Sequence, residues 1–184
     1  INYKEEKAMK DYTRKISIVL EEKHPVIEFA ADQLSHYLNC AGIESRVSSN
    51  GLTKLKNKNQ ISLMIMNSSE VDRIFIKQKR DGYTIAGSNP RSVLFASYRF
   101  LYELGFRWIR PGNRGEIIPE ITGIKRNINV DEQASYKYRT LCIEGSTSLQ
   151  HVLDLIDWAA KNYMNGYFIQ FDFGTYFFKM WYQH

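Results

Sequence analysis

The sequence is poor in the residues that stabilise small disulfide-rich domains and fibres. It contains two cysteines, Cys40 and Cys142, four prolines and eleven glycines among 184 residues. Two distant cysteines match no metal-binding spacing and are too few for a disulfide framework, so we expect two buried free thiols rather than a bridge. Eleven glycines exclude a collagen-like fibre, and an aromatic content of 14% excludes a disordered chain. A globular protein remains.

Long hydrophobic runs are also missing. No stretch approaches the roughly 18 apolar residues of a membrane span, so none is predicted. The start at Ile1 lacks the apolar core of a signal peptide. For a chain that starts without Met we expect one of two origins: loss of an export signal, which favours the periplasm or the extracellular space, or shortening in cloning. The compartment stays open.

Charge of one sign is only modestly in excess. Lysine and arginine number 25 against 20 acidic residues, which gives a net charge of +5. This permits weak attraction to phosphate or to acidic polysaccharide. The basic clusters are Lys54, Lys56 and Lys58, and Lys77, Lys79 and Arg80. No nucleic-acid-binding signature accompanies them, so we predict no nucleic-acid partner.

Strand and helix signals alternate through the first hundred residues. His24-Pro25 and Asn89-Pro90 each pair a polar residue with a proline suited to a first helical turn, and Gly105 ends the second helix. The predicted strands are 15–22, 46–48, 60–66 and 83–86. None of the four histidines has a paired spacing, so surface or capping roles are expected and no metal site is predicted.

The pattern changes after Phe106. Residues 106–119 are rich in turn formers, with a possible type II turn at Pro111-Gly112, and 124–130 alternates weakly like an edge strand. Residues 131–135 are typical of a domain boundary.

A strand–helix–strand unit follows this boundary. Strands are predicted at 139–144 and 167–173, around a helix that Thr147 or Ser148 caps and Gly166 ends. The expected buried stripe of the helix is Leu149, Val152, Leu153, Ile156, Ala160 and Tyr163. Two such apolar strands need further parallel strands to cover them.

One segment carries a family resemblance. Residues 91–112, RSVLFASYRFLYELGFRWIRPG, with Gly115–Pro119 after them, resemble the N-terminal accessory domain of large glycoside hydrolases. The likeness is greatest to bacterial alpha-glucuronidases and more distant to beta-hexosaminidases. Residues 81–85 match the same pattern, and the segment from Tyr138 to Phe171 resembles the start of the catalytic barrel.

The resemblance implies an α+β fold with a mixed, largely antiparallel sheet and two helices on one face, followed by a βαβ fragment of a truncated (β/α)8 barrel. The implied domains are residues 1–131 and 132–184. The implied activity is hydrolysis of a glycosidic bond in an oligosaccharide or polysaccharide, alpha-glucuronidase-like and without a cofactor. Its catalytic residues belong to later barrel strands, so we expect no catalytic residue and no turnover in these 184 residues.

Three residues are candidates for substrate binding. Glu144 and Asp172 lie near the ends of neighbouring strands, where the active sites of such barrels gather. Arg139 matches a substrate-binding arginine of beta-hexosaminidases. The alternatives are that Glu144 pairs with Arg139 or a nearby loop, that Asp172 sits in a turn, and that Arg139 is structural.

Two further interpretations concern exposed or basic side chains. Trp108 is expected to be a packing anchor rather than a sugar-stacking platform. Arg107, Arg110 and Arg114 form either an anion site or a solvated rim paired with Glu116 and Glu120. The alternative to a hydrolase is a carbohydrate-binding module that grips glycan with aromatics such as Phe177, Trp181 and Tyr182.

Overall fold

The computed structural model describes residues 15–48, 59–66, 68–124, 127–144, 148–170 and 174–183. The chain divides into two compact units. Unit 1 contains the chain up to Phe106 together with Ile118–Ala134, and unit 2 contains Arg107–Ile117 together with the chain from Ser135. The predicted domains, 1–131 and 132–184, stay a prediction.

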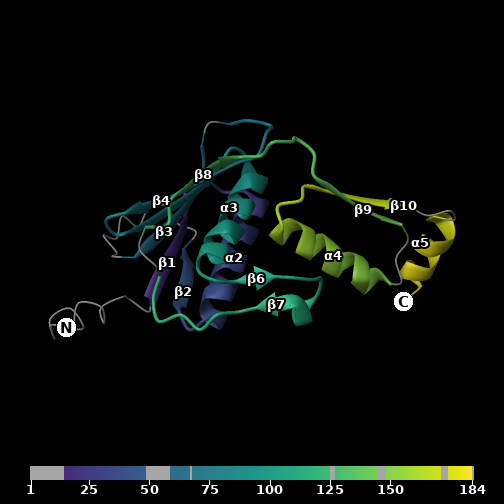
Figure 1. Cartoon of the computed structure of the whole chain (residues 1–184), viewed down its shortest axis with the longest axis horizontal. Coiled ribbons are helices and arrows are strands. Elements are labelled where there is room, and N and C mark those ends of the chain that lie inside the picture. Colours follow the sequence, from purple (N-terminus) through teal and green to yellow (C-terminus); the bar gives the residue numbers. More distant parts are fainter. Residues whose placement is uncertain are drawn as a thin grey trace. The chain divides into compact units, whose positions relative to one another are not determined.

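Unit 1 is built on a six-stranded sheet in the order β2-β1-β3-β5-β4-β8 (Figure 1). The strands are β1 (Lys15–Leu20), β2 (Glu44–Ser48), β3 (Gln60–Ile65), β4 (Arg73–Lys79), β5 (Gly82–Gly87) and β8 (Val130–Gln133). Strand β4 is absent from the sequence-based expectations. The edge strand β8 begins at Val130, where the expected strand ended.

The sheet is mixed, as predicted, but the prediction that it is largely antiparallel is wrong. Three of its five pairings, β1–β2, β1–β3 and β3–β5, are parallel. The other two, β4–β5 and β4–β8, are antiparallel. The reason is that helix α2 (Pro25–Cys40) connects β1 to β2 as a crossover, so that β2 runs in the same direction as β1.

Helices α2 and α3 (Pro90–Glu103) pack against each other on one face of this sheet, as predicted (Figure 1). The His24 ring accepts a hydrogen bond from the Val26 N–H at 3.1 Å, so this histidine caps α2. Asn89 caps α3 by accepting from the Ser92 N–H at 2.9 Å. The cap at Asn89-Pro90 was predicted, and the cap by His24 agrees with the surface or capping role expected of the histidines.

Two arginines hold the edge strand β8. Arg99 donates two hydrogen bonds to the Glu132 carboxylate, at 2.6 and 2.9 Å, and Arg73 donates two to Asp131, both at 2.8 Å. These bonds lower the pKa of Glu132 and of Asp131. Paired charges on an edge strand also disfavour its pairing with another chain.

Gly82 supplies the first prediction. A Cβ at this position would lie 1.8 Å from the backbone oxygen of Gln60, its partner in the β3–β5 register, and Gly82 has φ +147°. We expect Gly82→Ala to lower the free energy of unfolding by about 2–4 kcal/mol because the two strands must separate. Urea unfolding monitored by circular dichroism measures the loss.

The matched control is Gly174→Ala. Its nearest neighbour would be a Phe178 ring carbon at 3.9 Å, an ordinary contact. We expect a change within about 0.5 kcal/mol. Equal effects of the two substitutions would contradict the close approach at Gly82.

Unit 2 combines a short hairpin with a parallel strand pair. The hairpin consists of β6 (Arg107–Trp108), a 3-10 turn at Asn113–Gly115 and β7 (Glu116–Ile117). The parallel pair is β9 (Thr140–Glu144) and β10 (Gly166–Gln170), connected by helix α4 (Leu149–Lys161), and helix α5 (Gly174–Tyr182) comes last. The predicted βαβ unit is therefore present, whereas a truncated barrel stays a prediction.

Two local expectations in unit 2 are wrong. Gly112 has φ 76° but ψ 165°, far from the ψ near 0° of a type II turn. Helix α4 ends at Lys161 rather than at Gly166, because Tyr163 adopts φ 64° and the Met164 N–H bonds back to the Ala159 carbonyl. This is a Schellman cap formed without glycine.

Both cysteines are free, as predicted, but the prediction that they are buried is wrong, since both are exposed. Cys40 lies on the outer side of α2, opposite the stripe of Ala30, Leu34 and Leu38 that packs in the core. Cys142 points from the uncovered face of β9. Within the described ranges, no helix has the length and apolar character required to cross a membrane.

Candidate functional site

The carboxyl-terminal edge of the β9–β10 pair brings two polar residues together. Glu144 is the last residue of β9, and the parallel register places it opposite Gln170, the last residue of β10. Neighbouring strands lie about 4.8 Å apart, so both residues occupy one edge. Asp172 lies outside the described residues.

The two faces of this strand pair differ in exposure. On one face, Leu141, Ile143, Tyr167 and Ile169 are half-buried, whereas on the other Thr140, Cys142, Phe168 and Gln170 are exposed. Because α4 is the crossover connection, it covers one face of the pair. The exposed face therefore has no cover from the described part of unit 2, and Phe168 is 53% exposed there.

Arg139 lies at the opposite end of β9 from Glu144. Its Nε donates to the Tyr163 carbonyl and its Nη1 to the Tyr136 carbonyl, both at 2.8 Å. Its own N–H donates to Asn165 Oδ1 at 2.8 Å. Arg139 thus ties the start of β9 to the turn that ends α4, and the structure does not bring it together with Glu144.

One side of α4 packs against the β6–β7 hairpin. Trp158 Nε1 donates to the Trp108 carbonyl at 2.9 Å, and Trp108 is only 6% exposed, in agreement with a packing anchor. Lys161 Nζ contacts Glu116 Oε1 at 2.9 Å and Asp157 Oδ2 at 2.5 Å. Lys161 is 6% exposed, and its ammonium lies 5.9 Å from the centre of the Trp108 ring.

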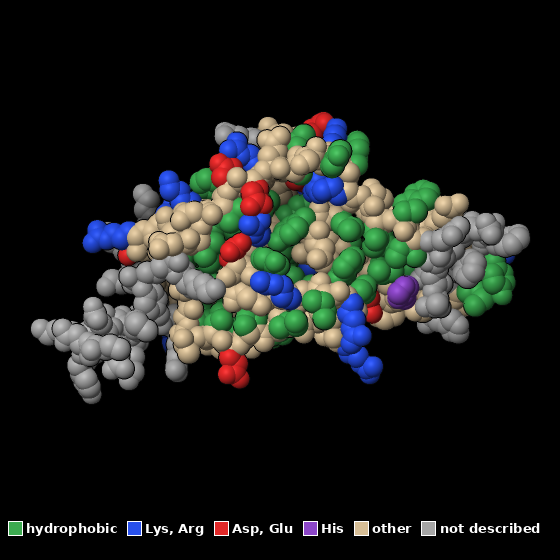
Figure 2. Space-filling model, viewed as in Figure 1, with side chains coloured by type: hydrophobic (Ala, Val, Ile, Leu, Met, Phe, Trp, Pro, Cys, Tyr) green, Lys and Arg blue, Asp and Glu red, His purple; other side chains and the backbone are tan. Residues whose placement is uncertain are grey.

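A second side of α4 is buried, but it shares only Val152 with the stripe expected from the sequence. Val152, Leu155 and Ala159 are buried, whereas Leu149 and Leu153 are about half exposed. Ile156 is exposed as well, so Leu149, Leu153 and Ile156 form a third side of the helix, which we call the open stripe. Apolar side chains gather at the surface over α4 in Figure 2.

Burial changes the chemistry of one tyrosine near the start of β10. The Tyr167 hydroxyl is buried and has no hydrogen-bond partner among the described residues, and desolvation raises its pKa. No group of three or more histidine, cysteine, aspartate or glutamate side chains in the described ranges is arranged to hold a metal ion.

Sequence reasoning missed Gln170 and Lys161. Gln170 is identified as the neighbour of Glu144 only from the β9–β10 register, and no local sequence pattern predicts that register. Lys161 follows Asp157 by four residues, a spacing that signals a helical ion pair, but nothing local indicates burial against Glu116.

Comparisons with known proteins show which solved structures share the fold of this chain. No protein-family model matches the chain, and no curated protein matches it in sequence. A GH138 enzyme targeting pectin rhamnogalacturonan II matches in structure with a TM-score of 0.61 and 16% identity, over 84% of this chain and 24% of that chain.

Two further solved structures match. A family 89 glycoside hydrolase from Clostridium perfringens, in complex with PUGNAc, has a TM-score of 0.51 and 12% identity, over 77% of this chain and 16% of that chain. CpGH84D has a TM-score of 0.50 and 15% identity, over 86% of this chain and 27% of that chain. The chain thus spans about a quarter or less of their lengths, and the predicted glycoside-hydrolase resemblance is confirmed at the level of fold. Alpha-glucuronidase likeness stays a prediction.

Proposed function

We propose that the chain is the non-catalytic N-terminal portion of a carbohydrate-active glycoside hydrolase. In this proposal unit 1 is an accessory domain, and β9, α4 and β10 open a (β/α)8 barrel whose later strands hydrolyse the glycosidic bond of an oligosaccharide or polysaccharide. Alpha-glucuronidase-like activity is the narrower form of the proposal, supported by the resemblance of residues 91–119.

The observation that carries the proposal is the pair of uncovered apolar surfaces in unit 2. In a barrel, one face of each strand points inward, and each helix packs between neighbouring helices. The exposed face of β9–β10 fits an inward face. The open stripe of Leu149, Leu153 and Ile156 fits the contact with the next barrel helix of the same polypeptide, since the matched hydrolases are about four to six times longer than the part aligned.

Glu144 has the position of a substrate-binding residue under this proposal. It is the last residue of β9, opposite Gln170 in the register, and it ends the strand where barrel active sites gather. Asp172 shares the proposed role by its position in the sequence. Arg139, at the other end of β9, has the bonds of a structural residue, and a role in substrate binding would require those bonds to break.

The test compares two proteins on aryl glycosides and plant oligosaccharides: the 184-residue chain and a longer polypeptide from the same reading frame. We expect hydrolysis only by the longer one, and Glu144→Gln in it to raise KM roughly 10-fold with a smaller change in kcat. Glu21→Gln, at an exposed position of unit 1, is the control and leaves both unchanged. Turnover by the 184-residue chain would overturn the assignment of catalysis to later strands.

A non-catalytic carbohydrate-binding module is the second candidate. Exposed aromatics on α5, Tyr176, Phe178 and Tyr182, favour it. If the longer polypeptide has no glycosidase activity while the 184-residue chain binds glycan through α5, this candidate replaces the first.

A further inference from the structure

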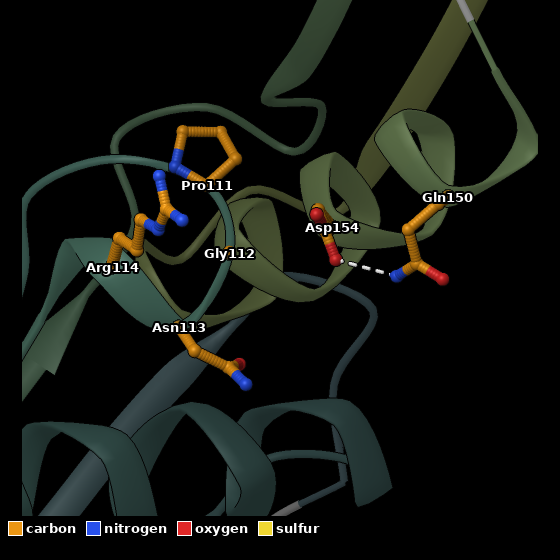
Figure 3. Close-up of a pocket in the computed structure, with 6 residues that line it drawn as sticks. All are labelled: Pro111, Gly112, Asn113, Arg114, Gln150 and Asp154. Carbon is orange, nitrogen blue, oxygen red and sulfur yellow. Dashed lines mark hydrogen bonds between the residues drawn. The ribbon is translucent and has the colours of Figure 1, made fainter.

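We propose that unit 2 holds a second sugar-binding site, in a polar pocket between the hairpin turn and α4. This inference requires no hydrolase parent and does not use the β9–β10 edge. The pocket has a volume of about 380 Å³ and is lined by Pro111, Gly112, Asn113, Arg114, Gln150 and Asp154 (Figure 3). That volume lies in the range of about 300–1,000 Å³ typical of small-molecule sites.

The α4 wall of the pocket is a preorganised acceptor. Gln150 and Asp154 are one helical turn apart, and Gln150 Nε2 donates to Asp154 Oδ1 at 2.8 Å (Figure 3). This bond fixes the carboxylate through Oδ1, and Oδ2 accepts no hydrogen bond from the described residues. Asp154 is half-buried, so solvent screens its oxygens less than those of a surface carboxylate.

The opposite wall comes from the turn of the hairpin. Gly112 approaches Asp154 so closely that a Cβ there would lie 3.2 Å from Oδ2, so a side chain at this position would press on the carboxylate. Arg114 and Asn113 add exposed donors, and Pro111 adds an apolar surface. The wall from the turn thus brings hydrogen-bond donors and one apolar ring to a pocket whose other wall holds a fixed acceptor.

This lining selects a class of ligand. One guanidinium and one carboxylate balance in charge, which disfavours a strongly charged ligand. Amides that both donate and accept suit hydroxyl groups, which also do both. A neutral sugar with adjacent hydroxyls satisfies Arg114 as an acceptor and Asp154 as a donor at the same time, whereas a metal cation cannot accept from Arg114 and the negative charge of a phosphate is repelled by Asp154.

The experiment is a titration of the 15N-labelled chain with the neutral disaccharides cellobiose, xylobiose and galactobiose, and with digalacturonic acid. We expect saturable amide shifts at Gly112, Asn113 and Gln150 with a Kd of about 1–10 mM for a neutral disaccharide, about −3 to −4 kcal/mol. Asp154→Ala should weaken binding at least 10-fold. His151→Gln, on an exposed part of the same helix, is the control and should leave it unchanged.

Three outcomes would overturn the inference. The first is the absence of saturable shifts up to 50 mM, and the second is tighter binding of digalacturonic acid than of every neutral sugar. The third is a response confined to the residues around Glu144 and Gln170, which would leave the proposed function standing while removing this second site. Equal affinity in Asp154→Ala and the unsubstituted chain would likewise contradict it.

Discussion

Asp72→Ala is expected to lower the free energy of unfolding of unit 1 by about 3 kcal/mol. Asp72 is 3% exposed and precedes β4. Its carboxylate accepts hydrogen bonds from Arg91 at 3.0 Å, from Ser92 Oγ at 2.8 Å and from Asn89 Nδ2 at 3.0 Å. Removing one partner of a buried ion pair typically costs about 3–5 kcal/mol, and we take the lower end because Arg91 is 42% exposed and regains water.

The loss should be specific to the start of α3. Asn89 caps this helix and Ser92 is fully buried in its first turn, so both lose a partner when the carboxylate is removed. Hydrogen exchange should show opening of α3 before α2. Asp72→Asn, which keeps an acceptor oxygen but no charge, should cost about half as much.

Asp32→Ala is the control for this experiment. Asp32 lies on the exposed side of α2, so its removal should change stability by less than about 0.5 kcal/mol. Urea midpoints at constant m-value measure all three variants. A midpoint for Asp72→Ala equal to that of Asp32→Ala would show that the Asp72 network adds no stability.

The elements that could be predicted from the sequence are those with local signals. Helices α2 and α3 were predicted because His24-Pro25 and Asn89-Pro90 act within one turn. The strand order could not be predicted, since β5 inserts between β3 and β4 and no local pattern records that choice. Strand β4 was missed because its basic residues Lys77 and Lys79 interrupt a short apolar run.

The candidate site, like the fold, could be predicted only where its residues carry a local sequence signal. The end of β9 at Glu144 follows from the strand pattern, whereas its neighbour Gln170 depends on register. The pocket residues Gln150 and Asp154 carry an i, i+4 spacing, but their partner Gly112 lies about forty residues earlier in the chain. A site built from two segments that lie far apart in the sequence has no characteristic residue spacing from which it could be predicted.

Helix α4 explains why most of the predicted buried stripe was wrong. One side of α4 bonds to the hairpin through Trp158, a second side is buried, and the open stripe is exposed among the described residues. A helix with apolar residues on more than one side is ordinarily surrounded by other elements, so periodicity alone gives no single inward direction. The exposed Leu153 and Ile156 are therefore the residues for which the proposed barrel supplies a partner.

Lys161 carries the second large effect, because its removal takes a buried ammonium away from the Glu116 carboxylate. Glu116 is 16% exposed at its side chain, and Lys161 pairs with it across the hairpin and α4. We expect Lys161→Met to destabilise unit 2 by about 3 kcal/mol, although the thioether replaces much of the apolar stem. Asp157, whose side chain is 45% exposed, can regain water and adds less to the loss.

The double variant Lys161→Met/Glu116→Gln separates charge from packing. Neutralising Glu116 removes the half-buried charge whose attraction to the Lys161 ammonium Lys161→Met abolishes, so the double variant should recover about half of the loss. Lys179→Met, on the exposed side of α5, is the matched control and should change stability by less than about 0.5 kcal/mol. Hydrogen exchange at Trp108 and Trp158 should rise in Lys161→Met and fall back in the double variant. If the double variant is less stable than Lys161→Met, the ammonium is not compensating Glu116, and the hairpin is held to α4 by packing and by the Trp158–Trp108 hydrogen bond instead.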